Sequence, residues 1–143
     1  MEVAARGLKV TVDFVDVDSA DRLESTIAAL AKKQVKGIVV RETPLLISKG
    51  KSVGEIATKY RIAAVGFKEV AEGGGLIGYS ADLPAMWRRA ATYIDKILKG
   101  AKPGDLPVEQ ATKFDLIVNK KTANALGIKI PNSILVRADK VIE

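Results

Sequence analysis

The sequence predicts an α/β protein, a three-layer sandwich in which helices cover both faces of a mostly parallel sheet. Two observations favour this class. Short apolar runs of strand length alternate along the chain with longer segments of helical periodicity. Several of these runs are apolar throughout, which is typical of parallel strands buried on both faces. Because the 143 residues have the size of one domain, we expect a single domain over residues 1–143.

The first predicted elements are a strand and a helix. Residues 9–17 (KVTVDFVDV) contain many β-branched side chains and alternate in polarity, which predicts a strand. Residues 18–34 follow, with Leu23, Ile27 and Leu30 on one helical face. This spacing predicts a helix that packs against the sheet.

Two buried strands with a helix between them are predicted next. Residues 35–40 (VKGIVV) and 62–67 (IAAVGF) are short apolar runs, and each predicts a strand covered on both sides. The helix between them is expected to begin at Ser52, because Ser52 and Glu55 have the spacing of a capping box.

The stretch GGGLIG at residues 73–78 matches the G-x-G-x-x-G spacing of dinucleotide-binding turns. Such a turn follows a strand and opens a helix, so that the helix N-terminus faces the phosphates. Here the order is reversed. Residues 67–73 predict a short helix, with Gly73 in the left-handed position after its end, and residues 76–80 predict a strand. We therefore expect a tight turn into a strand and no nucleotide site.

The C-terminal half begins with the longest predicted helix. Asp82 can cap it, Pro84 lies in its first turn and Gly100 ends it. Its apolar face consists of Trp87, Ala90, Ala91, Ile94 and Leu98. The predicted elements beyond it are a linker at 101–107, a strand at 113–119, a helix at 120–127 and an extended segment at 133–143.

The composition argues against several classes of function. The chain has no Cys and no His, which removes thiolate metal sites, thiol nucleophiles and the commonest general base. No paired carboxylates stand out, so we expect no catalytic residues, no metal site and no cofactor. The formal charge of +6 is spread over scattered basic pairs, which argues against nucleic-acid binding. No apolar run approaches the roughly 20 residues of a membrane span.

Candidate ligand-binding residues lie at the carboxyl ends of the predicted strands, where open parallel sheets bind small molecules. These residues are Glu42, Thr43, Phe67, Tyr79 and Ser80. They combine apolar walls with a few polar groups, as small-molecule pockets do. Structural roles are the alternatives, because Glu42 can pair with a nearby Lys and both aromatic residues can belong to the core. Lys36 and Lys113 are expected at the opposite end of the sheet.

The sequence also resembles a known family. Residues 66–93 (GFKEVAEGGGLIGYSADLPAMWRRAATY) and 106–131 (LPVEQATKFDLIVNKKTANALGIKIP) are similar to the C-terminal lobe of ABC-transporter substrate-binding proteins of type I periplasmic-binding-protein fold. The resemblance implies one lobe of a two-lobed protein that binds a small polar or aromatic molecule, such as an amino acid, without turnover. It also implies that residues 82–107 cross to the first lobe, with hinge crossings at 79–80 and 108–110.

The resemblance further implies a partner and a location. A full-length member serves an ABC-transporter permease and is periplasmic, whereas a chain that truly starts at Met1, without a signal peptide, would be cytoplasmic. Without a first lobe to cover, the helix at 82–99 would leave its apolar face in water, which predicts a homodimer through this helix.

Two departures from the family fall at ligand-facing strand ends. The strand before Phe67 lacks the Tyr that members commonly have, and Gly78-Tyr79-Ser80 replaces their common Ser-Tyr-Gly. The resemblance therefore does not give the ligand. The alternatives to a solute-binding component are an enzyme or a ligand-sensing regulator built on the same lobe, or a non-functional truncated remnant.

Overall fold

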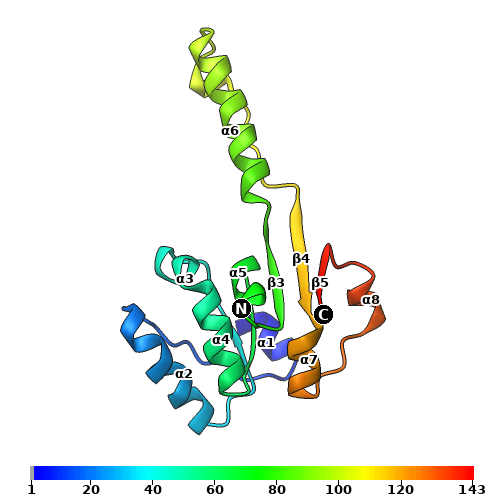
Figure 1. Cartoon of the computed structure of the whole chain (residues 1–143). Helices are drawn as coiled ribbons and strands as arrows, with labels where there is room; N and C mark the ends of the chain where they lie inside the picture. Colours follow the sequence, from blue (N-terminus) through cyan, green and yellow to red (C-terminus); the bar gives the residue numbers. More distant parts are fainter. Residues whose placement is uncertain (1) are drawn as a thin grey trace.

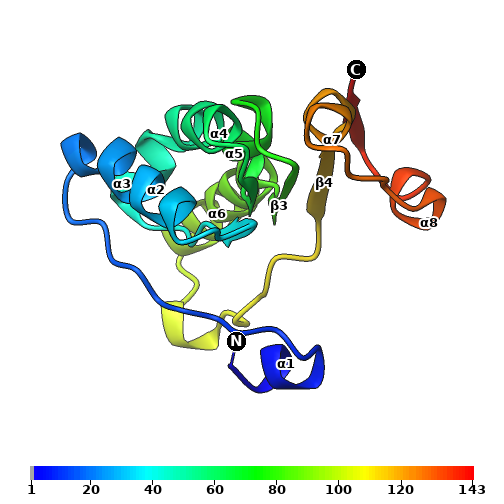
Figure 2. The same cartoon turned by 90° about the horizontal axis from the view of Figure 1, so that it is seen from below.

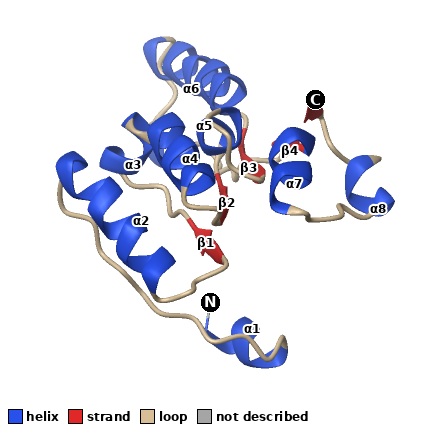
Figure 3. Cartoon of the chain, turned by 60° about the horizontal axis from the view of Figure 1, so that its bottom comes forward, coloured by secondary structure: helices blue, strands red, loops and turns tan. Residues whose placement is uncertain are grey.

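The computed structural model describes residues 2–143, and its strands form one five-stranded sheet (Figure 1). The strands are β1 Gly37–Val39, β2 Ala63–Gly66, β3 Ile77–Ala81, β4 Phe114–Asn119 and β5 Lys140–Ile142. They pair in the order of the sequence, and only β3 and β4 run antiparallel within this sheet. Helices lie on both sides of the sheet (Figure 3), so the predicted α/β class is confirmed.

The helices connect these strands in the order expected of an α/β fold. The α-helices within residues 2–143 are α1 Glu2–Gly7, α2 Leu23–Lys32, α3 Pro44–Ser48, α4 Gly50–Lys59, α5 Lys68–Glu72, α6 Leu83–Leu98, α7 Lys120–Leu126 and α8 Asn132–Leu135. Short 3-10 turns lie at Ala20–Arg22 and Pro103–Asp105.

The core forms where α2 and α4 meet β2 and α5. Leu23 and Ile27 on α2, and Val53 and Ala57 on α4, are spaced four residues apart, so each pair lies on one helical face. The buried cluster consists of Leu23, Ile27, Val53, Ala57, Ile62, Ala64, Phe67 and Val70. The helix predicted at 18–34 and the strand predicted at 62–67 are confirmed, each with shorter bounds.

The glycines between α5 and β3 allow a close turn into a strand. A Cβ at Gly73 would overlap the backbone of Lys51 on α4, whereas Gly74 adopts φ +103°. The left-handed residue is therefore Gly74, and the prediction of Gly73 (φ −83°) for that position is wrong. The predicted order of helix, glycines and strand is confirmed, since α5 ends at Glu72 and β3 begins at Ile77.

β3 and β4 carry the chain away from the body of the molecule and back again (Figure 1). We call residues 82–113, which comprise α6 and the segment that returns to β4, the arm. Asp82 caps α6 by accepting a hydrogen bond from the N–H of Ala85 at 3.0 Å, and Gly100 follows the helix with φ +99°. Both predicted ends of this helix are confirmed.

The strand predicted at residues 9–17 is absent, and this prediction is wrong. These residues form a loop between α1 and α2 (Figure 2), because no segment within residues 2–143 pairs with them and a strand requires a hydrogen-bonded neighbour. β1 is consequently an edge strand. Val39 is 64% exposed, so this strand is not buried on both faces as predicted.

Two other element boundaries differ from the prediction. The helix expected at Ser52 begins at Gly50, because α3 and α4 follow each other closely and Gly50 fits against the ring of Phe67, where a Cβ would lie 2.6 Å from Cε2. The extended segment expected at 133–143 is interrupted by α8, because the Pro131 carbonyl accepts from the N–H groups of two following residues and starts a helical turn.

Candidate functional site

The carboxyl ends of β1, β2 and β3 lie at one edge of the sheet. The three strands are parallel and in register, with Val39 beside Val65 and Gly66 beside Gly78. Loops that follow these strands therefore meet at the same edge, where α/β proteins bind small molecules. The antiparallel β4 also begins at this edge. Lys113 consequently lies here, and its expected place at the opposite end was wrong.

Ser80 and the start of α5 form the middle of the candidate site. The backbone N–H of Lys68 donates a long hydrogen bond of 3.4 Å to Ser80 Oγ. Phe67, just before it, has its ring in the core and is 3% exposed. The structure therefore brings Ser80, Lys68 and the backbone of Phe67 together. The ring of Phe67 is part of the core and does not line the site.

Tyr79 lies on the opposite face of β3 from Ser80, because successive side chains of a strand alternate. Its ring stacks on Phe114 of β4, with 5.4 Å between ring centroids and an interplanar angle of 13°. Tyr79 remains 57% exposed, so this aromatic pair forms an accessible apolar surface at the base of the arm. Phe114 was not predicted as a site residue. It lies two residues before Leu116, the partner of Tyr79 in the antiparallel pair, so its side chain is on the same face of the sheet as that of Tyr79.

Glu42 and Thr43 lie in the loop after β1, and both are exposed. Thr43 Oγ1 accepts a hydrogen bond of 3.2 Å from the N–H of Leu46 and caps α3. Within residues 2–143 Glu42 makes no salt bridge, so its carboxylate faces solvent at the edge of the sheet. No hydrogen bond among the described residues joins these two side chains to Ser80.

An ion pair borders the site where the arm begins. Lys113 Nζ lies 2.7 Å from Asp82 Oδ2, and Asp82 also caps α6. The hydrogen bond from Lys113, followed by that from the Ala85 N–H, lowers the pKa of Asp82 below its ordinary range. The outgoing and returning ends of the arm are therefore tied together at the edge of the sheet.

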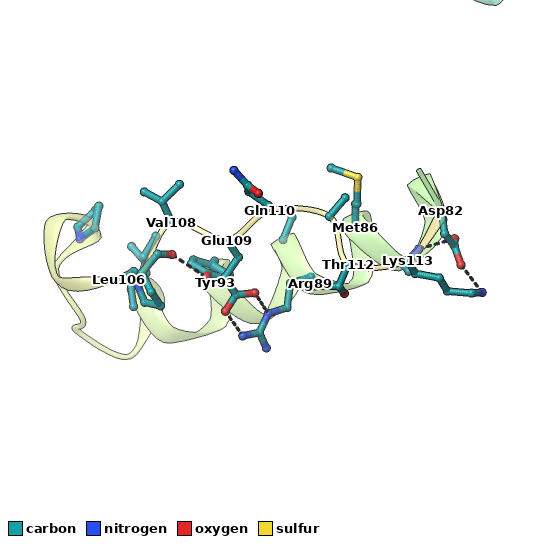
Figure 4. A pocket seen from close by; sticks show the side chains of 16 residues that line it. Asp82, Met86, Arg89, Tyr93, Leu106, Val108, Glu109, Gln110, Thr112 and Lys113 are labelled. Atoms are coloured by element: carbon teal, nitrogen blue, oxygen red, sulfur yellow. Dashed lines mark hydrogen bonds and ion pairs between the residues drawn. The ribbon is translucent and has the colours of Figure 1, made fainter. Parts of the chain in front are cut away.

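A groove lies along the arm (Figure 4) and reaches Asp82 and Lys113 at the strand ends. This groove of about 810 Å³ runs between α6 and the returning segment. Arg89 forms a bidentate ion pair with Glu109 across it, and the hydroxyl of Tyr93 donates to the Pro107 carbonyl at 2.8 Å. The hydrogen bond from Arg89 lowers the pKa of Glu109 to about 2. These contacts hold the returning segment beside α6.

The residues within 2–143 offer no evident metal site, since no group of three or more carboxylates is placed to hold an ion. In the same part of the chain, no helix combines the length and apolar character needed to cross a membrane.

The mostly parallel sheet with helices on both sides is a periplasmic-binding-protein-like α/β fold. The chain belongs to the ABC transporter substrate binding protein family, whose sequence model matches residues 2–142. The resemblance inferred from the sequence is therefore confirmed. Comparison with curated protein sequences gives no significant match.

Solved structures support this assignment. An ABC domain from Streptococcus pneumoniae in complex with L-Trp is 30% identical, with a TM-score of 0.86 over 98% of this chain and 48% of that chain. A conserved domain protein from Vibrio cholerae is 25% identical, with a TM-score of 0.86 over 98% of this chain and 47% of that chain. The ligand-free, open substrate-binding protein CD0873 from Clostridium difficile, 22% identical with a TM-score of 0.67, shares the fold over 99% of this chain and 47% of that chain. The chain thus spans about half the length of each.

Proposed function

We propose that this chain is a solute-binding component of an ABC importer and binds a small polar or aromatic molecule, such as an amino acid, without chemical turnover. The family match over residues 2–142 carries the proposal. The L-Trp complex of the 30% identical structure supports an amino acid as the class of ligand. The loops at the strand ends combine a few polar groups with apolar surface, which is the composition that sites for such ligands have.

The proposed ligand site consists of Glu42, Thr43, Phe67, Tyr79 and Ser80. In this site the Glu42 carboxylate meets the ammonium group of the ligand, and the hydroxyls of Thr43 and Ser80 bind its polar atoms. Phe67 contributes through its backbone, because its ring is buried. The exposed ring of Tyr79, stacked on Phe114, provides apolar surface where the chain leaves the lobe.

We further propose that residues 82–107 cross to a first lobe that closes over the proposed ligand site. The projecting arm and its apolar groove support this arrangement, because they provide a surface for a second body. A lobe that binds alone lacks the contacts of its counterpart. Since each loss of about 1.4 kcal/mol weakens binding tenfold, this chain alone should bind its solute at roughly millimolar concentration.

The test is a chemical-shift titration of the chain with a panel of amino acids that includes L-Trp. We expect shifts at residues 41–43, 67–68 and 79–81, and binding weakened up to roughly tenfold by Ser80→Ala or Glu42→Gln. Ser133→Ala on α8 is the matched control and should leave binding unchanged. Shifts confined to the opposite end of the sheet, near Lys36, would contradict the proposed site.

The proposed partners and location follow from the family. Its members are typically periplasmic or extracellular, and we propose a periplasmic location and an ABC-transporter permease as the partner of the full-length protein. We also propose that a chain without a first lobe to cover the helix at 82–99 forms a homodimer through this helix. Trp87 is 73% exposed on this helix, and the apolar residues Ile94 and Leu98 beside it are exposed as well.

A further inference from the structure

The passage from the sheet into the arm takes a single residue. β3 ends at Ala81 and α6 begins at Leu83, so Asp82 alone joins the strand to the helix. Its backbone, with φ −69° and ψ 87°, has neither strand nor helix geometry. On the returning side, Lys113 directly precedes β4, and its carbonyl accepts a hydrogen bond of 3.1 Å from the N–H of Asp82. The direction of α6 relative to the sheet is therefore set where Asp82 and Lys113 meet.

The remainder of the arm is attached to α6. Residues 106–113 belong to no helix or strand. Arg89 on α6 pairs with Glu109, and the hydroxyl of Tyr93 on α6 donates to the Pro107 carbonyl. Because these contacts join the returning segment to the helix, we treat the arm as one body whose pivot lies at residues 82 and 113.

The carboxylate of Asp82 holds both sides of this pivot (Figure 4). Its Oδ1 accepts from the N–H of Ala85 at 3.0 Å and caps α6, whereas its Oδ2 lies 2.7 Å from Lys113 Nζ. The Asp82 side chain is only 10% exposed. Water and salt screen a partly buried pair less than an exposed one, and separating such a pair leaves an unpaired charge away from water. One carboxylate thus ties the start of the helix to the returning strand.

The charges around the pair keep Asp82 ionised. The hydrogen bond from Lys113 is the largest cause of the lowered pKa of Asp82, and the positive charge of Arg88 on α6 adds to it. Lys113 Nζ also lies 3.9 Å from Asp115 Oδ1, and the negative charge of Asp139 acts on it as well. Both partners are therefore charged at neutral pH, and the ion pair is formed.

We propose that the ion pair between Asp82 and Lys113 fixes the direction of α6 relative to the sheet, and that breaking this pair releases the arm to rotate about residues 82 and 113. The pair needs no solute and no second lobe, because both groups belong to this chain. Its consequence for closure rests on the function proposed above. Ser80 lies two residues before Asp82, so a solute bound at Ser80 lies next to the pivot, and the pair then fixes the angle at which a first lobe meets this one.

Four variants of the full chain separate the ion pair from the helix cap. Asp82→Asn and Lys113→Gln remove the pair from its two sides, and α6 is retained in both, because Asn caps a helix as well as Asp does. Lys113→Arg keeps the cation and should restore the native behaviour. Lys99→Gln is the matched control, because it removes an exposed pair with Asp95 at the other end of α6. Circular dichroism should show the same helix content in all four variants.

The fluorescence of Trp87 reports the motion of the arm, because Trp87 is the only tryptophan of the chain and lies on α6. Time-resolved anisotropy is measured without solute, at a concentration at which sedimentation shows monomers. In the unmodified chain, Lys113→Arg and Lys99→Gln, the slow decay should follow the rotation of the whole molecule. In Asp82→Asn and Lys113→Gln, a faster component on the nanosecond scale should appear beside the motion of the side chain itself.

A second measurement identifies the pair as the cause. By carboxyl NMR, the pKa of Asp82 should rise toward its ordinary value in Lys113→Gln and stay low in Lys113→Arg and Lys99→Gln. The proposal is overturned if Trp87 decays alike in Lys113→Gln and Lys99→Gln, or if the faster component is already present in the unmodified chain. Since no solute is present, a failure of solute binding would leave these results unchanged.

Discussion

At Gly73 the chain passes so close to α4 that a Cβ would overlap the backbone of Lys51. The next residue, Gly74, adopts a positive φ, and its carbonyl accepts hydrogen bonds from Thr58 Oγ1 at 2.6 Å and Thr122 Oγ1 at 2.7 Å. Two hydroxyls from different helices thus fix a turn that only small residues can form. The glycines position β3, and through it the candidate site, at the far end of the strand.

Gly73→Ala tests this explanation. The new methyl group meets backbone atoms, which cannot move aside as a flexible side chain can, so we expect a loss of about 1–3 kcal/mol in the free energy of unfolding. Gly104→Ala on the arm is the matched control, because no atom lies within 4 Å of its added Cβ. Urea denaturation of both variants measures the difference, and equal stabilities would contradict the close-approach argument.

At the residue scale, the sequence locates the candidate site but not the direction of each side chain. Adjacent Tyr79 and Ser80 were predicted together, yet strand alternation turns them to opposite faces. Phe67 follows a buried strand, and an aromatic residue there suits the core as well as a pocket. Its burial depends on Gly50, a residue seventeen positions earlier, and such a contact is not visible in a local pattern.

At the scale of elements, the sequence predicted correctly those elements whose ends depend on their own residues. α6 has its cap and its terminal glycine in the sequence, and both ends were predicted. The strand at residues 9–17 has a strong local pattern and is nevertheless absent, because pairing depends on a neighbour that no local pattern reveals. The starts of α4 and α8 likewise depend on contacts that the local pattern does not show. Gly50 packs against Phe67 at the start of α4, and the Pro131 carbonyl accepts the first hydrogen bonds of α8.

The Arg89–Glu109 pair makes the arm sensitive to acid. The pKa of Glu109, about 2, lies below its ordinary value of 4.5. A lowered carboxyl pKa stabilises the folded arm fully above pH 4.5, and this contribution is lost as the pH falls from 4.5 toward 2. We expect amides of the returning segment to lose protection from hydrogen exchange over this range.

The Glu109→Gln variant should show reduced protection of the returning segment already at neutral pH. Asp95→Asn is its matched control, because Asp95 pairs with Lys99 at the C-terminal end of α6 and does not join α6 to the returning segment. If both variants left the returning segment equally protected, the ion pair would not be what holds it beside the helix.

At the scale of the whole molecule, the arm exposes more apolar surface than an isolated chain readily tolerates. Besides Trp87, the exposed apolar side chains include Leu98 on α6 and Val108 on the returning segment. Burying one large apolar side chain contributes about 1.5–3 kcal/mol, so several exposed together favour association.

We therefore expect Trp87→Lys to weaken self-association through the helix at 82–99 by roughly tenfold or more, measured by sedimentation. Val136→Lys is the matched control, because Val136 is also an exposed apolar residue but lies at the end of α8, away from the arm. A chain that is monomeric without any substitution would contradict this interface.

The antiparallel pairing of β3 and β4 also limits how the arm can move. The two strands stay in register from Ile77 and Val118 to Ala81 and Phe114, so the outgoing and returning chains form one two-stranded ribbon. A ribbon flexes easily across its flat face, whereas sideways bending would slide one strand along the other and break the hydrogen bonds between them. We therefore expect the arm to bend more readily across the flat face of this ribbon than within its plane.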